Sequence, residues 1–126
     1  MAIIEKELTD RNVIDQETVD EFRNRIQELL RQYVIPSTSK SDVETQILVD
    51  TTNDHYQLVD VGWHKDQRIY CCVLHIDIKD GKVWIQQNMT DQHVAEELVA
   101  LGIPPGKIVL GFHPPYVRPH TGFAVN

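Results

Sequence analysis

Residues 68–87, RIYCCVLHIDIKDGKVWIQQ, decide the fold of this 126-residue chain. Asp80-Gly81 stands between two apolar runs that alternate with polar residues, which is the strongest short-range signal for a two-residue β-hairpin loop. With these two residues as the loop, the predicted cross-strand pairs are Lys79–Lys82, Ile78–Val83, Ile76–Ile85 and Leu74–Gln87. The stretch therefore predicts two long antiparallel strands in a defined register.

The first of these strands has one predominantly apolar side and one mixed side. Successive strand residues face opposite ways, so alternation places one set together as the predicted bed for a helix: Tyr70, Cys72, Leu74, Ile76 and Ile78. The opposite side carries Asp77, predicted opposite Trp84, and His75, predicted opposite Gln86. That polar side is a candidate functional surface.

Two helices flank the predicted sheet. A stripe with helical spacing follows Asp15, the predicted N-cap, and consists of Val19, Phe22, Ile26, Leu29, Leu30 and Tyr33. Thr90 is the predicted cap of a second, shorter helix that carries Val94 and Leu98 and ends before Gly102.

Short β-prone runs complete the fold. They cover Ile47–Val49, Tyr56–Val61 and Lys107–Phe112, with a further edge strand predicted over Thr121–Val125. The fold class is therefore α+β: an antiparallel sheet of four or more strands, a long N-terminal helix, and a second helix before the C-terminal segment. Residues 15–126 are predicted to form a single domain behind a flexible acidic lead-in, residues 1–14.

Charge and composition exclude several functions. Nineteen acidic against twelve basic residues give a net charge of -7, which disfavours direct nucleic-acid binding. No apolar run approaches the roughly 18 residues of a membrane helix, so we expect a cytoplasmic protein without membrane contact. The adjacent Cys71 and Cys72 would need strained geometry to form a mutual disulfide and are predicted to be reduced thiols.

The polar sheet face is a candidate site made of His75, Asp77, Trp84 and Gln86. His113 and His120 could join it in a metal shell, but no HExxH or paired CxxC accompanies them. We therefore predict no metal, no cofactor and no catalytic residue, and keep a small-ligand or metal-binding enzyme on this face as the alternative. The Lys79–Lys82 stretch is read as a plain turn rather than an anion site.

The C-terminal segment combines aromatic rings, prolines and an arginine without acidic residues. Such groups on a stiff backbone are suited to anchor a partner protein. The candidate interface is Phe112, His113, Pro114, Pro115, Tyr116, Arg118, Thr121 and Phe123. An ordered loop whose aromatics close the core explains the same residues, and Lys107 with Arg118 could instead contact DNA.

Several separated motifs resemble the XisI family, the fdxN element excision controlling factor proteins of cyanobacteria. They are QLVDVGW at 57–63, HIDIKDGKVWIQ at 75–86, IVLGFHPP at 108–115 and TGFA at 121–124. The resemblance runs from about Asp20 to the C-terminus. The chain departs from the family in residues 1–12, which are extra, and at Asn88-Met89, where an acidic residue and glycine are expected.

The resemblance implies an accessory role rather than catalysis. XisI-like proteins are linked to programmed excision of a DNA element, beside a recombinase and a companion, XisH, that resembles a small nuclease. No established catalytic residue can be carried over. We therefore expect a non-catalytic controlling factor that binds an XisH-like partner, with a recombinase as a further functional partner, and that self-associates into a homo-oligomer.

Overall fold

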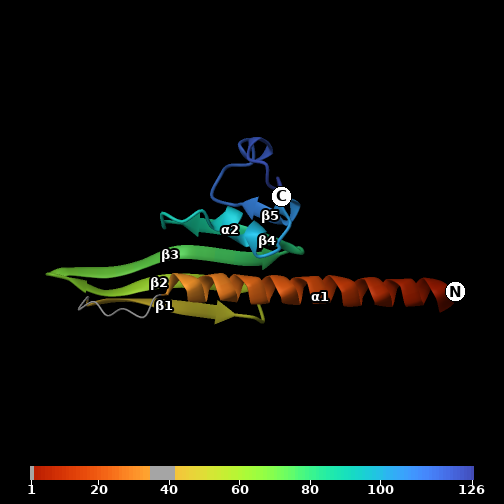
Figure 1. Cartoon of the computed structure of the whole chain (residues 1–126), viewed down its shortest axis with the longest axis horizontal. Coiled ribbons are helices and arrows are strands. Elements are labelled where there is room, and N and C mark those ends of the chain that lie inside the picture. The colour runs from red at the N-terminus through yellow and green to blue at the C-terminus, as the bar shows by residue number, and fades with distance from the viewer. Residues whose placement is uncertain (1, 35–41) are drawn as a thin grey trace.

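The structure, a computed structural model, describes the backbone of residues 2–34 and 42–126 and the side chains of residues 16–34 and 42–126. Its elements are α1 (Ala2–Tyr33), β1 (Val43–Asp50), β2 (His55–His64), β3 (Gln67–Lys79), β4 (Lys82–Asn88), α2 (Val94–Ala100) and β5 (Ile108–Leu110), with 3-10 turns at Pro105–Lys107 and Arg118–His120. Figure 1 shows α1 running alongside the strands, with its N-terminal part reaching beyond the sheet.

The five strands form one mixed sheet in the order β1-β2-β3-β4-β5. The first four pair antiparallel, as predicted, but β5 pairs parallel to β4. The purely antiparallel prediction is wrong here because the chain passes through α2 between these strands and returns in the same direction. The edge strand predicted over Thr121–Val125 is reduced to a single bridge between Val109 and Ala124.

Helix α1 covers one face of the sheet through its predicted stripe. Phe22, Ile26, Leu29 and Leu30 are buried in the main core together with strand residues such as Leu58 and Ile76. The helix begins at Ala2, well before the predicted start. Asp15 therefore lies inside the helix, and the prediction that it is the N-cap is wrong. The side chains of residues 1–15 lie outside the described part, and the separation of residues 1–14 from the domain stays a prediction. Within the described ranges, no helix is both long and apolar enough to cross a membrane.

Helix α2 starts later than predicted. Thr90 does not cap it, because the Thr90 hydroxyl accepts from the backbone N–H of Gln92 and donates to the Asn88 side chain. These bonds hold residues 88–92 in a turn, and the helix begins at Val94. Gly102 follows the helix with φ of +107°, the left-handed conformation expected just past a C-terminus.

Two β-bulges change the predicted faces of β3 and β4. The pairing with β2 shifts between Leu74 and Cys72, and the pairing with β4 shifts between Ile76 and His75. The predicted hairpin register is confirmed from the Asp80-Gly81 loop to Ile76, but Leu74 pairs with Asn88 rather than Gln87. Beyond the first bulge the alternation reverses, so Val73 packs against the core and Tyr70 is 75% exposed. The prediction that Tyr70 and Cys72 face the helix is therefore wrong.

An ion pair fastens α1 to the β1–β2 turn. Arg23 donates from Nε to Asp54 Oδ1 at 2.7 Å and from Nη2 to Asp54 Oδ2 at 3.0 Å, and the Tyr56 hydroxyl also donates to Oδ1 at 2.9 Å. Partial burial alone would raise the pKa of Asp54, but the hydrogen bonds from Arg23 and Tyr56 outweigh it and lower the pKa. The carboxylate is thus stabilised by the fold.

Asp54→Asn is expected to lower the free energy of unfolding by about 1 kcal/mol at pH 7. The pKa of Asp54 is lower in the folded state than in the unfolded state, where it is about 3.9. The stabilisation by Asp54 is therefore complete above the unfolded-state pKa and is lost as the pH falls through the folded-state pKa. Urea denaturation should therefore show that the difference in free energy of unfolding between the unmodified chain and Asp54→Asn is smaller at pH 3 than at pH 7. Asp66→Asn, at the exposed β2–β3 turn, is the control for charge alone. If this difference in free energy were the same at both pH values, Asp54 would not stabilise the fold through its lowered pKa.

Candidate functional site

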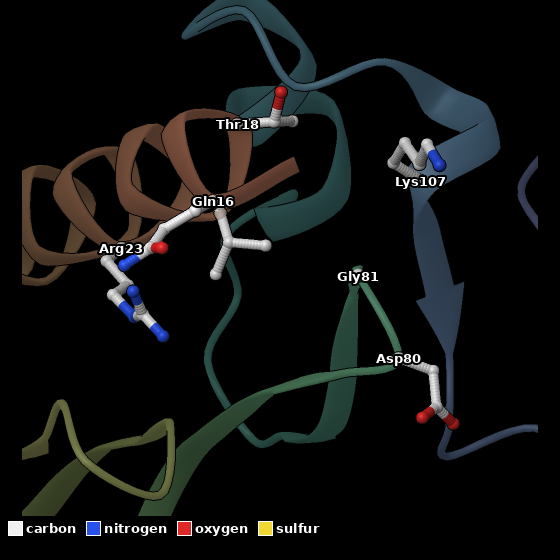
Figure 2. A pocket seen from close by; sticks show the side chains of 7 residues that line it. Gln16, Thr18, Arg23, Asp80, Gly81 and Lys107 are labelled. Carbon is white, nitrogen blue, oxygen red and sulfur yellow. The ribbon is translucent and has the colours of Figure 1, made fainter. Parts of the chain in front are cut away.

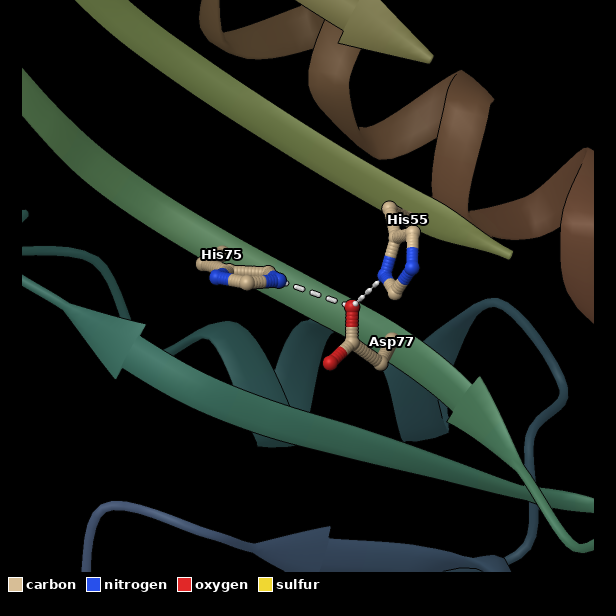
Figure 3. A group of neighbouring side chains, drawn as sticks. All are labelled: His55, His75 and Asp77. Atoms are coloured by element: carbon tan, nitrogen blue, oxygen red, sulfur yellow. Dashed lines mark hydrogen bonds and ion pairs between the residues drawn. The ribbon is translucent and has the colours of Figure 1, made fainter. Parts of the chain in front are cut away.

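Two histidines converge on one carboxylate on the sheet face opposite the main core. His55 begins β2, and His75 and Asp77 alternate along β3 with the buried Leu74, Ile76 and Ile78. His55 Nδ1 and His75 Nε2 each lie 2.7 Å from Asp77 Oδ1. Figure 3 shows both rings directed at this oxygen. The sheet thus brings His55 of β2 together with His75 and Asp77 of β3, although His55 and Asp77 are 22 positions apart in sequence.

Asp77 is held as a carboxylate within this cluster. Burial would raise its pKa, but hydrogen bonds from His55 and His75, and from Gln86 Nε2 to Oδ2 at 3.2 Å, together lower it. In return, the hydrogen bond to Asp77 raises the pKa of His55. Both carboxylate oxygens are therefore occupied by donors from three strands.

The predicted polar site is assembled, although with different neighbours than expected. Trp84 lies opposite Asp77 as predicted, whereas His75 lies opposite Gln87, because Gln86 is the extra residue of the β4 bulge. The predicted His75–Gln86 pairing is therefore wrong, yet Gln86 still reaches Asp77 with its side chain. His55 was not among the predicted site residues. Its position opposite Asp77 across β2 and β3 is the signal that places it there.

Trp84 connects the polar face to the C-terminal segment. The Arg118 guanidinium carbon lies 5.2 Å and the Lys79 ammonium nitrogen 5.0 Å from the centre of its ring. Gly111 permits this approach, because a Cβ there would lie 2.6 Å from Gln86 Oε1 and 3.2 Å from the Trp84 ring. The segment is therefore held against the sheet by the Arg118–Trp84 cation–π contact and by the close backbone approach at Gly111.

The candidate interface residues of this segment divide into an inner and an outer group. Arg118 donates to the backbone oxygens of His113 and Val125, Thr121 donates to that of Arg118, and Phe123 packs against the core. These three residues hold the segment in place. The outer group, Phe112, Pro114, Pro115 and Tyr116, is exposed, and the Tyr116 side chain is 79% accessible.

His113 does not join the polar cluster. Its ring lies 4.6 Å from the ring of Phe112. Among the described side chains that could hold a metal ion, the group brought together consists of His55, His75 and Asp77. The metal shell that included His113 and His120 is therefore not assembled by this fold.

A hollow of about 490 Å³ lies between α1, the β3–β4 turn and Lys107 (Figure 2). Arg23, which lines it, is committed to Asp20 and Asp54, and Asp80 adds a carboxylate to its rim. Lys107 is the second basic residue of the lining, and neither Lys79 nor Lys82 lines this hollow, so the reading of the Lys79–Lys82 stretch as a plain turn stays a prediction.

Large apolar side chains remain exposed on the face that carries the polar cluster. Leu48, Trp63 and Tyr70 lie there by strand alternation and are between 47% and 75% exposed. The self-association expected through this face stays a prediction, and these residues are the ones that it would cover.

Known proteins resemble this chain over most of its length. The family model described as XisI protein matches residues 16–125. A crystal structure of an XisI-like protein from Anabaena variabilis ATCC 29413 is 47% identical with a TM-score of 0.79, and the match covers 86% of this chain and 99% of that one. That of the fdxN element excision controlling factor XisI from the same organism is 33% identical with a TM-score of 0.75 and the same coverage. Among curated proteins, none matches this chain.

Proposed function

This chain belongs to the XisI family, and from that membership we propose that it is a non-catalytic controlling factor that acts in DNA excision through a protein partner. The observation that carries the proposal is the match to the fdxN element excision controlling factor XisI, 33% identical over 86% of this chain. The partner that we propose is an XisH-like protein of nuclease type, with a recombinase acting in the same excision.

The charge of the chain favours an indirect role at DNA. The net charge of -7 opposes association with phosphate backbones. Arg118, a candidate for direct DNA contact, has its guanidinium engaged by two backbone oxygens and the Trp84 ring. An acidic protein is complementary to the basic groove that a DNA-handling partner presents.

The outer group of the C-terminal segment is the proposed docking surface. Phe112 and Tyr116 project from a backbone that is stiffened by Pro114 and Pro115 and secured by Arg118. Exposed aromatic side chains on an ordered segment lose little conformational entropy on binding, which is the property of interface anchors. The inner group would act by presenting these anchors rather than by touching the partner.

Tyr116→Ala is expected to weaken binding to an XisH-like partner at least tenfold, because the variant removes the proposed anchor without touching the core. The measurement is co-expression of the two proteins, pull-down and size-exclusion chromatography, followed by titration of the purified partner. Tyr70→Ala is the matched control: it removes the same side chain at nearly the same exposure, 75% against 79%, from the sheet face.

Three results would count against the proposal. No complex with the unmodified chain would contradict the partner-binding function itself. Equal binding by Tyr116→Ala would contradict the location of the interface. Loss of binding in Tyr70→Ala alone would move the interface to the sheet face.

A further inference from the structure

His55, His75 and Asp77 form a cluster that the proposed partner surface does not use. We propose that these three side chains bind one divalent transition-metal ion, for which Zn²⁺ is the representative. Their ligand atoms, two imidazole nitrogens and a carboxylate oxygen, all lie within 4.8 Å of one another. The proposal concerns metal binding and assigns no reaction to the site.

The distances within the cluster are close to those of a coordinated ion. Zn²⁺ binds nitrogen and oxygen ligands at about 2.0 to 2.2 Å, so neighbouring ligand atoms in a tetrahedral site lie about 3.3 Å apart. The two N···O contacts to Asp77 Oδ1 are 2.7 Å. Opening each of these two contacts by about 0.6 Å makes room for the ion.

The surroundings of Asp77 orient it for this role. Gln86 donates from Nε2 to Oδ2, the oxygen that the histidines do not contact. Metal-binding carboxylates are commonly held in this way by a hydrogen bond from outside the ligand set. The Asp77 side chain is 16% exposed and that of His75 is 29% exposed, whereas that of His55 is 52% exposed. The ligands are therefore fixed at the sheet and accessible from solvent at His55.

The ligand set selects the class of ion. Two imidazoles and one carboxylate suit Zn²⁺, Co²⁺ or Ni²⁺, whereas Ca²⁺ and Mg²⁺ prefer oxygen ligands throughout. Three protein ligands leave a further coordination position on the solvent side for water or for a side chain of another protein. The site is thus suited to reversible loading with a borderline transition-metal ion.

Isothermal titration calorimetry of the purified chain with ZnCl₂ tests the proposal. We expect one Zn²⁺ per chain, and at least tenfold weaker binding by His75→Ala and by Asp77→Asn. Titration with CoCl₂ should give the visible absorption of a Co²⁺ ion bound by nitrogen and oxygen ligands, and this absorption should be lost in the same variants. MgCl₂ should give no comparable binding.

Two controls separate the cluster from other zinc-binding groups of the chain. His64→Ala removes an exposed histidine at the end of β2, outside the cluster, and Cys71→Ser removes a thiol. Both should bind Zn²⁺ as the unmodified chain does. If circular dichroism shows that His75→Ala or Asp77→Asn fails to fold, His55→Ala, a substitution at the most exposed of the three ligands, takes its place. The proposal is overturned if the unmodified chain binds no stoichiometric Zn²⁺, or if binding depends on Cys71 or His64 and not on the cluster.

Discussion

Gly62→Ala is expected to lower the free energy of unfolding by about 3 kcal/mol, the upper part of the usual range for an added atom without space. A Cβ at Gly62 would lie 2.0 Å from the Asp42 carbonyl oxygen and 2.6 Å from the Val43 Cα. Both atoms are backbone, so a side-chain rotation cannot make room. The start of β1 has to move, which also breaks the bond from the Trp63 N–H to the Asp42 oxygen.

Urea denaturation gives the stability change, and hydrogen exchange at Val43–Thr45 shows whether β1 has separated from β2. Gly106→Ala is the matched control, because a Cβ at Gly106 meets no atom within 4 Å. If Gly62→Ala were as stable as Gly106→Ala, the close approach of β1 to β2 at this point would be wrong.

Arg118→Ala is expected to release the C-terminal segment at a cost of about 2 kcal/mol of local stability. The substitution removes a cation–π contact with Trp84 and two charged hydrogen bonds, to His113 O at 3.0 Å and to Val125 O at 3.3 Å. Amide exchange over residues 113–125 should become about thirtyfold faster, the rate equivalent of this free energy. Arg118→Lys is expected to keep only part of this local stability, because the lysine ammonium lacks the planar guanidinium that stacks on a ring and donates several hydrogen bonds at once.

Lys107→Ala is the control for charge, since Lys107 is an exposed basic residue just ahead of β5. It should leave exchange in residues 113–125 unchanged. Unchanged exchange in Arg118→Ala as well would mean that Phe123 and the Val109–Ala124 bridge hold the segment without Arg118. Arg118 would then have no role in presenting Tyr116.

The parts of the fold that depend on local pattern follow from the sequence. The Asp80-Gly81 loop fixes the adjacent pairs down to Ile76–Ile85, because a two-residue loop permits one register. The apolar stripe of α1 identifies its buried face for the same local reason. The parallel β4–β5 pair was missed although the predicted helix between these two runs is the kind of crossover connection that joins parallel strands.

The composition of the polar cluster depends on a bulge that no local signal marks. His64 pairs with Gln67 across the β2–β3 turn, and that register would place His55 opposite Ile76, on the core face. The shift at Val73 moves the pairing by one residue and brings His55 opposite Asp77 instead. His75 and Asp77 were recognised because they alternate within one strand. His55 could not be recognised from the sequence, because only the bulge at Val73 brings it opposite Asp77.

Excision frequency is the most direct measurement of whether the chain is a controlling factor that works through a partner. Cells that carry the excisable element, the recombinase and the XisH-like protein would receive this chain, its Tyr116→Ala variant, its Tyr70→Ala variant, or none. We predict that excision depends on the chain, falls in Tyr116→Ala toward the level without it, and is retained in Tyr70→Ala. Equal excision with and without the chain would contradict the proposed function.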